Sequence, residues 1–140
     1  MINDFRVICD DLRPQLIGLS ETWLSEDKHF DSEFHLNGFT LYLKDRKWRG
    51  GGIAVNAING SNFLHEEVVI EDNIDFQIIV IKMKQKIWKP FDVFTIYVKP
   101  NAMNHRIIQQ FNSILTPYLP NECLTVRDIN FDIKTNQNNV

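Results

Sequence analysis

The sequence has too few cysteines to be held together by a disulfide framework or a cysteine-based metal site. It contains only Cys9 and Cys123, and no Cys-x-x-Cys pair or other metal-binding spacing. We interpret both as buried thiols in a reducing compartment, and we expect an intracellular protein, cytoplasmic or nuclear. With 44% hydrophobic residues among 140, the chain is predicted to form one domain around a core of its own.

Long apolar runs are also missing. The longest strongly apolar run, Ile78 to Ile81, is far shorter than the roughly 20 residues of a membrane-spanning helix, so no membrane partner is expected. The N-terminal segment carries Asp4 and Asp10, unlike a secretory signal. The glycine run 50–52 does not fit a P-loop, because a predicted strand follows it, and no small-molecule cofactor is expected.

An excess of positive charge is absent as well. The formal net charge is −3, which argues against a protein that holds nucleic acid by bulk electrostatics. It is compatible with an enzyme in which a metal ion offsets the charge of a phosphate. The histidines show no metal-ligand spacing, and we interpret all of them as surface residues: His29, His35, His65 and His105.

Predicted strands outnumber predicted helices. Apolar residues at helical spacing (Ile2, Phe5, Ile8, Cys9 and Leu12) predict one face of a short helix that ends before Pro14. Strands are predicted over 15–20, 39–43, 53–57, 76–84, 91–97 and 122–127, and a second helical stripe runs from Met103 to Tyr118. A solvated loop is predicted around Glu66, Glu67, Glu71, Asp72 and Asp75. The pattern indicates an α/β or α+β layered domain.

Two predicted strands end in side chains suited to phosphoester chemistry. Glu21 directly follows the first strand, and Asp128 and Asn130 follow the last, on one face of an extended segment. A carboxylate can orient or deprotonate a water, and an amide can donate a hydrogen bond to a phosphoryl oxygen. The alternatives are a turn cap for Glu21 and an Asx turn for Asp128 and Asn130.

Two further segments are candidates for phosphate contact. Tyr97, Lys99 and Asn101 follow a predicted strand and offer a phenol, an ammonium and an amide; the alternative is a plain connection in which Asn101 caps the next helix. The basic segment 44–49 surrounds Trp48, and Arg49 is its candidate contact to a nucleic-acid backbone. A solvated loop is the alternative for that segment.

Four blocks of the sequence stand in a fixed order: residues 14–24, which read Pro-Gln-Leu-Ile-Gly-Leu-Ser-Glu-Thr-Trp-Leu, then 37–46 with 49–55, then 96–101, and finally 124–133. In this order they resemble the endonuclease domains of non-LTR (LINE-type) retrotransposons. The first block resembles the family segment PDIIGLTETWL. Residues 37–46 with 49–55 resemble GY…RKDR…RGGGVAI, 96–101 resemble VYRPPN, and 124–133 resemble LIVGDFNIDL. The blocks are typical of the endonuclease/exonuclease/phosphatase superfamily, and the Glu-Thr-Trp-Leu and Arg-Gly-Gly-Gly blocks favour its retrotransposon branch.

The resemblance implies an α/β fold, part of a four-layered sandwich like that of deoxyribonuclease I, with two packed β-sheets flanked by helices. It also implies metal-dependent hydrolysis of phosphodiesters with Mg²⁺ or Mn²⁺, and DNA as the partner that is nicked. A protein of this kind needs few carboxylates, because Mg²⁺ keeps waters and phosphate oxygens among its ligands.

The same resemblance assigns roles to individual residues. Glu21 matches the metal-binding glutamate of the family, and Asp128 matches the aspartate that activates or positions the attacking water. Asn130 matches the asparagine that holds the phosphate, and Tyr97 the tyrosine near the scissile phosphate. Asn101 is a further candidate for contact with the phosphate.

The sequence departs from the family pattern in three respects. The family begins with a strand that carries an asparagine and ends with an Asp-His pair, and neither segment is present, so 1–134 are expected to form an incomplete domain before a polar tail, 135–140. Arg127 stands where the family has glycine. The alternatives to an active endonuclease are an inactive remnant that binds DNA weakly and a phosphatase of the same superfamily.

Overall fold

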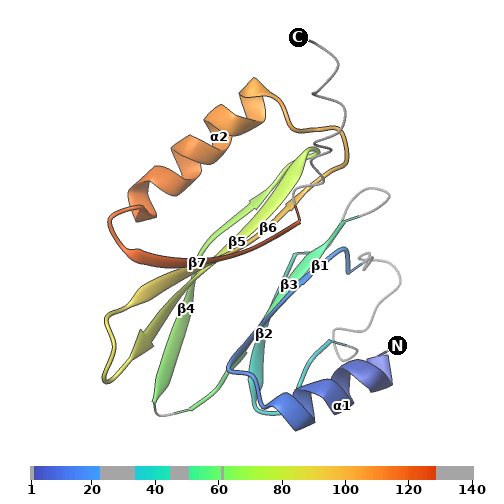
Figure 1. Cartoon of the computed structure of the whole chain (residues 1–140), viewed down its shortest axis with the longest axis vertical. Helices are drawn as coiled ribbons and strands as arrows, with labels where there is room; N and C mark the ends of the chain where they lie inside the picture. The colour runs from blue at the N-terminus through green and yellow to red at the C-terminus, as the bar shows by residue number, and fades with distance from the viewer. Residues whose placement is uncertain (1, 23–33, 45–50, 61, 129–140) are drawn as a thin grey trace.

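The computed structural model describes residues 2–22, 34–44, 51–60 and 62–128. In it two β-sheets pack face to face, with one helix outside each sheet (Figure 1). Along the chain the elements are α1 (Ile2–Leu12), β1 (Leu16–Ser20), β2 (Phe39–Lys44), β3 (Ile53–Ile58), β4 (Phe63–Asp72), β5 (Phe76–Gln85), β6 (Phe91–Val98), α2 (His105–Leu115), the 3-10 turn η2 (Thr116–Tyr118) and β7 (Glu122–Asp128). The predicted α/β class is confirmed.

The two sheets differ in their connections. Sheet A has the order β1-β3-β2, and both of its pairs are antiparallel. Sheet B has the order β4-β5-β6-β7, in which the first two pairs are antiparallel and β6 and β7 are parallel. A parallel pair requires a crossover, and α2 supplies it on the outer face of sheet B.

The core between the sheets follows from the two-residue period of the strands. Alternate side chains of β3, β5 and β6 meet in one buried cluster: Ile53, Val55, Ile79, Ile81, Met83, Val93 and Tyr97. Gly18 allows β1 to approach sheet B closely, because a Cβ there would lie 3.2 Å from Val126 Cγ1 and 3.4 Å from Thr95 Oγ1. The sheets are therefore in close contact at β1.

A second core lies between sheet B and α2. It contains side chains from the opposite faces of β5 and β6, from the connection after β6 and from α2: Phe76, Ile78, Val80, Phe94, Ile96, Val98, Ala102 and Ile107. The helix begins at a cap in which Asn104 Oδ1 accepts a hydrogen bond from the backbone N–H of Ile107 at 3.1 Å. Asn101 is therefore not the cap, because it lies in the preceding turn.

The predicted acidic loop is wrong. Glu66, Glu67, Glu71 and Asp72 belong to β4, and only Asp75 lies in a connection. β4 is an edge strand, where charged side chains are ordinary because they discourage pairing with other chains. Glu66 also forms an ion pair with Lys84 of the neighbouring strand at 3.3 Å. The acidic residues favoured the prediction of a loop, but the backbone of this segment forms a strand that pairs with β5.

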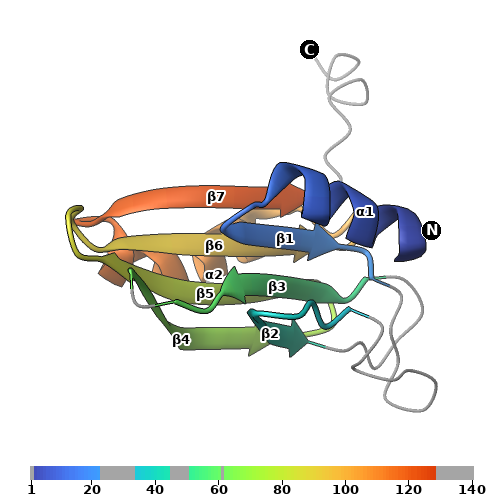
Figure 2. The ribbon, with the colours of Figure 1, turned by 90° about the horizontal axis from the view of Figure 1, so that it is seen from below.

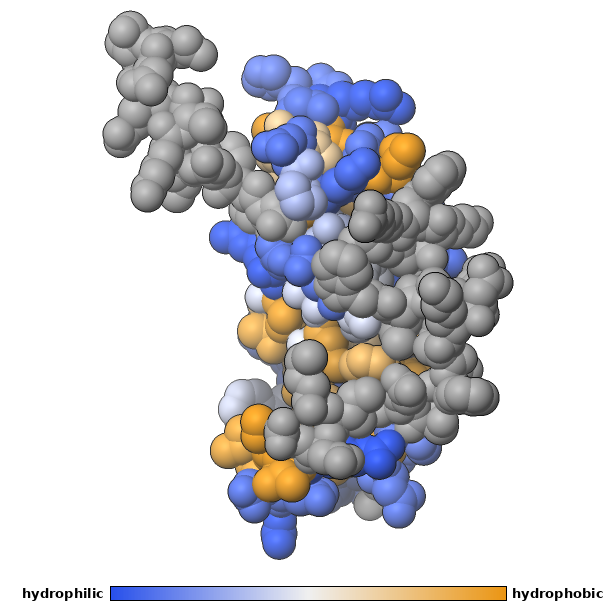
Figure 3. Space-filling view, turned by 90° about the vertical axis from the view of Figure 1, so that its right-hand side faces the viewer, coloured by the Kyte–Doolittle hydropathy of each residue, from blue (hydrophilic) through white to orange (hydrophobic). Residues whose placement is uncertain are grey.

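The apolar stripe predicted for α1 is only partly covered. Cys9 is buried, but Ile8 is 54% exposed and Leu12 is 73% exposed. In Figure 3 apolar side chains gather at the lower end of the molecule, where α1 lies. No helix among the described residues is long and apolar enough to cross a membrane.

Two interpretations of single side chains also need correction. Cys123 lies in β7, one of the two edge strands of sheet B, and is exposed, so only Cys9 is a buried thiol. His65 is half-buried rather than a free surface residue, and its Nδ1 lies 2.8 Å from Tyr42 Oη. This contact joins β4 of sheet B to β2 of sheet A, so His65 has a structural role.

Candidate active site

Three strands end at the same end of the sandwich. β1, β6 and β7 run in one direction, and their C-terminal ends lie together (Figure 2). Gly18 of β1 packs against Thr95 and Val126, which are register partners in the β6–β7 pair. The three strands are therefore level at these residues.

The predicted site residues follow a short distance further along the same strands. Tyr97 and Asp128 are register partners two positions beyond Thr95 and Val126. Ser20 occupies the equivalent place in β1, and Glu21 follows it directly. The fold thus brings three residues that are distant in the sequence, Glu21, Tyr97 and Asp128, to one end of the two sheets.

Glu21 occupies a turn with an uncommon backbone conformation. Its φ is 53°, in the left-handed region, which costs a non-glycine residue about 1–2 kcal/mol. The next residue, Thr22, donates its backbone N–H to the carbonyl of Gly52 at 3.1 Å. The Glu21 side chain is exposed at this turn. The structure therefore holds a solvent-facing carboxylate immediately beyond β1.

Tyr97 is buried between the sheets and is only 5% exposed. Its ring lies against Gly51: a Cβ on Gly51 would be 2.9 Å from Tyr97 Cε1, closer than side chains tolerate. Gly51 also has a φ of 104°, which favours glycine. Gly51 therefore allows the backbone to lie directly over the tyrosine ring.

Asp128 ends β7 and is half-buried. Because Val126 faces sheet A, the two-residue period places Asp128 on that same face, together with Tyr97. Arg127 has the opposite orientation and is exposed. The arginine that replaces the family glycine therefore does not share the face of the site.

The remaining predicted residues fall into two groups. Asn101 lies in the turn after β6, exposed and with a φ of 63°, where the N–H of Ala102 bonds to the carbonyl of Lys99 at 3.0 Å. It lies just beyond the C-terminal end of β6, at the same end of the sandwich as Tyr97. Arg49 and Asn130 lie outside the described residues.

A polar row across sheet B was not predicted. Asp72, Gln77, Tyr97 and Asp128 are successive register partners from β4 to β7. Gln77 is 5% exposed; its Oε1 accepts from the N–H of Gly52 at 2.9 Å, and its Nε2 donates to Asp72 Oδ1 at 3.1 Å. In the sequence, the signal that could have identified Gln77 is its position as a single polar residue directly before the apolar run 78–81.

The oxygen donors present suit a hard divalent cation. Among the described residues no three His, Cys, Asp or Glu side chains gather as a metal cluster. Mg²⁺ does not require such a cluster, because it binds one or two carboxylates and retains waters. Glu21 is one such carboxylate, and the buried Oγ1 of Thr22 beside it has no hydrogen-bond partner within the described part of the chain. These residues fit Mg²⁺ better than zinc.

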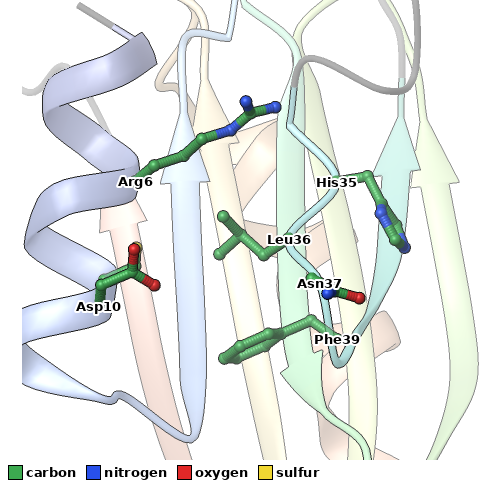
Figure 4. A pocket seen from close by; sticks show the side chains of 7 residues that line it. Arg6, Asp10, His35, Leu36, Asn37 and Phe39 are labelled. Carbon is green, nitrogen blue, oxygen red and sulfur yellow. The ribbon is translucent and has the colours of Figure 1, made fainter.

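A separate cavity of about 430 Å³ lies between α1 and the segment before β2 (Figure 4). It is lined by Arg6, Cys9, Asp10, His35, Leu36, Asn37 and Phe39. Glu21, Tyr97, Asn101 and Asp128 do not line it. It is thus distinct from the end of the sandwich where the predicted site residues meet.

Comparisons with known proteins are informative only at the level of structure. No family model matches the chain, and no curated protein matches it. The crystal structure of truncated Caenorhabditis elegans TDP2 does match, with a TM-score of 0.55 and 9% sequence identity, over 95% of this chain. This chain spans only 56% of the TDP2 chain. Such low identity shows the fold alone. The two sheets and two helices described above resemble those of TDP2, which has the deoxyribonuclease I-like fold.

Proposed function

We propose that this chain is a metal-dependent phosphodiesterase domain that nicks DNA, in the manner of non-LTR retrotransposon endonucleases. The observation that carries the proposal is the register pairing of Tyr97 with Asp128 at the end of the sandwich where Glu21 also lies. The four sequence blocks supply the roles, and the likeness to TDP2 supports the phosphodiesterase-like fold.

Each side chain has a distinct part in this reaction. Asp128 orients the attacking water and takes its proton as a general base while the water oxygen bonds to phosphorus. The ester bond between phosphorus and the leaving deoxyribose oxygen breaks, and that oxygen takes a proton from solvent. The hydroxyl of Tyr97 is assigned by the resemblance as a hydrogen-bond donor to a phosphoryl oxygen, where a fixed donor stabilises the charge that develops. Asn101 and, by resemblance, Asn130 hold the phosphate of the substrate, and Arg49 of the basic segment contacts the nucleic-acid backbone.

Glu21 is the proposed protein ligand of Mg²⁺ or Mn²⁺. The exposed carboxylate, held by an uncommon turn, is open to a hydrated cation without desolvation of the whole site. When bound, the metal would supply charge stabilisation at the phosphoryl oxygens. It would also offset the repulsion between DNA and a chain of net charge −3.

The orientation of Arg127 favours an active site over an eroded one. An arginine on the same face as Asp128 would occupy the space that the family keeps open, but its side chain belongs to the opposite face of β7. An inactive remnant is the alternative that the experiment separates from the proposal.

The proposal is tested by incubating the purified chain with supercoiled plasmid in Mg²⁺ and in EDTA. Nicking is expected in Mg²⁺ and not in EDTA. The Asp128→Asn variant is expected to lose nicking, whereas Glu122→Gln, which removes a carboxylate at the other end of β7, is expected to retain it. If the folded wild-type chain does not nick DNA in Mg²⁺, the remnant interpretation holds.

A further inference from the structure

Gln77 connects the two sides of the candidate site through the backbone of Gly51 and Gly52. It is buried in β5 beside Tyr97, its register partner in β6. From there its side-chain oxygen holds the N–H of Gly52 at 2.9 Å. The glycine segment that this bond fixes is the one that covers the ring of Tyr97.

The same glycine segment also reaches Glu21. The carbonyl of Gly52 accepts the N–H of Thr22 at 3.1 Å, so the segment contacts both the turn of Glu21 and the ring of Tyr97. A shift of the segment would therefore displace both side chains. Effects of this kind are large, because a misplacement of about 1 Å can cost about a hundredfold in rate.

Gln77 is itself oriented by charged neighbours. Its Nε2 donates to Asp72 Oδ1 at 3.1 Å, and Asp72 Oδ2 lies 3.5 Å from Lys44 Nζ on β2. An amide oxygen and nitrogen differ in their hydrogen-bonding roles, so the carboxylate of Asp72 determines which way the Gln77 amide faces. Because the amide nitrogen of Gln77 faces Asp72, its amide oxygen faces the backbone N–H of Gly52 and accepts a hydrogen bond from it.

We infer that Gln77, oriented by Asp72, is a positioning residue that sets the Gly51–Gly52 segment against both Tyr97 and the Glu21 turn. Its effect on the reaction rests on the proposed function. Its effect on the environment of Tyr97 is independent of any activity. The two consequences are measured separately.

The first measurement is ¹⁹F NMR of the chain labelled with 3-fluorotyrosine. The chain has three tyrosines, and Tyr97→Phe assigns the resonance of Tyr97. Gln77→Met removes both hydrogen bonds and is expected to shift that resonance. Thr95→Val, a change at a buried site of the same face of β6, is expected to leave it in place. An unshifted Tyr97 resonance in a folded Gln77→Met variant overturns the inference.

A second measurement exchanges the two partners and does not depend on Gln77→Met folding. Gln77→Glu places a carboxylate against Asp72 and is expected to shift the Tyr97 resonance. When Asp72→Asn is added, the amide nitrogen at position 72 can donate to the carboxylate at position 77, which is the reverse of the wild-type hydrogen bond. This double variant is expected to return the Tyr97 resonance toward its wild-type position. If the double variant is no closer to wild type than Gln77→Glu, the proposed orienting role of Asp72 is overturned.

The catalytic consequence is read in plasmid nicking. Gln77→Glu is expected to lower kcat about a hundredfold, with a smaller change in KM, and the double variant is expected to recover most of it. A wild-type chain that does not nick contradicts the proposed function, while the ¹⁹F result still decides the positioning role. Full kcat in Gln77→Glu, in a wild type that nicks, overturns the inference.

Discussion

Tyr97 and Asp128 lie directly opposite each other in the parallel pair of β6 and β7, and both belong to the face that meets sheet A. Neighbouring strands are about 4.8 Å apart, so register pairing alone holds their backbones side by side. The pairing depends on α2, which returns the chain to the edge of sheet B. A distant pair of residues in the sequence thus becomes one unit of the candidate site.

Among the three changes Gly51→Ala, Gly38→Ala and Gly60→Ala, the first is predicted to destabilise the fold most. The new Cβ meets both a φ of 104° and the ring of Tyr97 at 2.9 Å, so a cost above about 1 kcal/mol is expected. Gly38→Ala, at a φ of 83° with open space around it, tests backbone strain alone.

Gly60→Ala completes that series, because it meets neither a contact nor a left-handed backbone. The expected order of destabilisation in urea is Gly51, then Gly38, then Gly60. Equal unfolding free energies for Gly51→Ala and Gly60→Ala would contradict the close approach to Tyr97.

Asn104→Ala is predicted to destabilise the chain by about 1 kcal/mol, because the N–H of Ile107 loses its acceptor at the start of α2. Thermal unfolding followed by circular dichroism measures the change. Gln109→Ala, at an exposed position of the same helix, serves as the control and is expected to have little effect. Asn101→Gly, which keeps the left-handed backbone at a φ of 63° accessible, should likewise spare the helix, since Asn101 is not its cap; a loss as large as that of Asn104→Ala would contradict this assignment.

Because of Tyr42, the free energy of unfolding is predicted to vary with pH in the alkaline range. Desolvation raises its pKa above 10.0, and the charges of Glu67 and Glu66 raise it further. The folded state therefore favours the neutral phenol. This stabilisation is fully present below the unfolded pKa and is lost as the pH rises toward the folded pKa.

The predicted result is a fall in the free energy of unfolding above about pH 10 that is smaller in Tyr42→Phe. Tyr118, whose pKa is also raised by burial and by Asp92, is present in both proteins, so the difference isolates Tyr42. Identical pH profiles for the two proteins would show that the hydroxyl is not held between the sheets.

Glu21→Gln is predicted to raise the Mg²⁺ concentration needed for half-maximal nicking by about tenfold or more, because the cation loses its charged protein ligand. Unfolding in urea should change little, since the side chain is exposed. Glu122→Gln is the matched control. An unchanged Mg²⁺ dependence would remove Glu21 from the metal site.

The sequence was a good guide to strands that are apolar and a poor one to strands that are charged. The runs of β3, β5 and β6 were predicted within one or two residues, because most of their side chains are apolar and buried. β4 was missed, since an edge strand with Glu66 and Glu71 has the composition of a loop. Its pairing with β5 becomes visible only in three dimensions.

The candidate site, too, could be predicted from the sequence only in part. The positions of Glu21, Tyr97 and Asp128 could be predicted, because each stands where an apolar strand ends, whereas their roles in a site stay a prediction. The hydrogen bonds of Gln77 were not predictable, because they depend on the register of β4 with β5 and on the path of Gly52. Nor could the helical pattern distinguish Asn101 from Asn104 as the cap, because either amide can precede a helix.

The most direct test of the account is a double-mutant cycle of Tyr97→Phe and Asp128→Asn, measured as the initial rate of Mg²⁺-dependent plasmid nicking. Because the two residues are proposed to act as one unit, each single variant should lose most of the rate and the double variant should lose little more. The account is contradicted if the two losses multiply as independent effects, or if either single variant nicks at the wild-type rate.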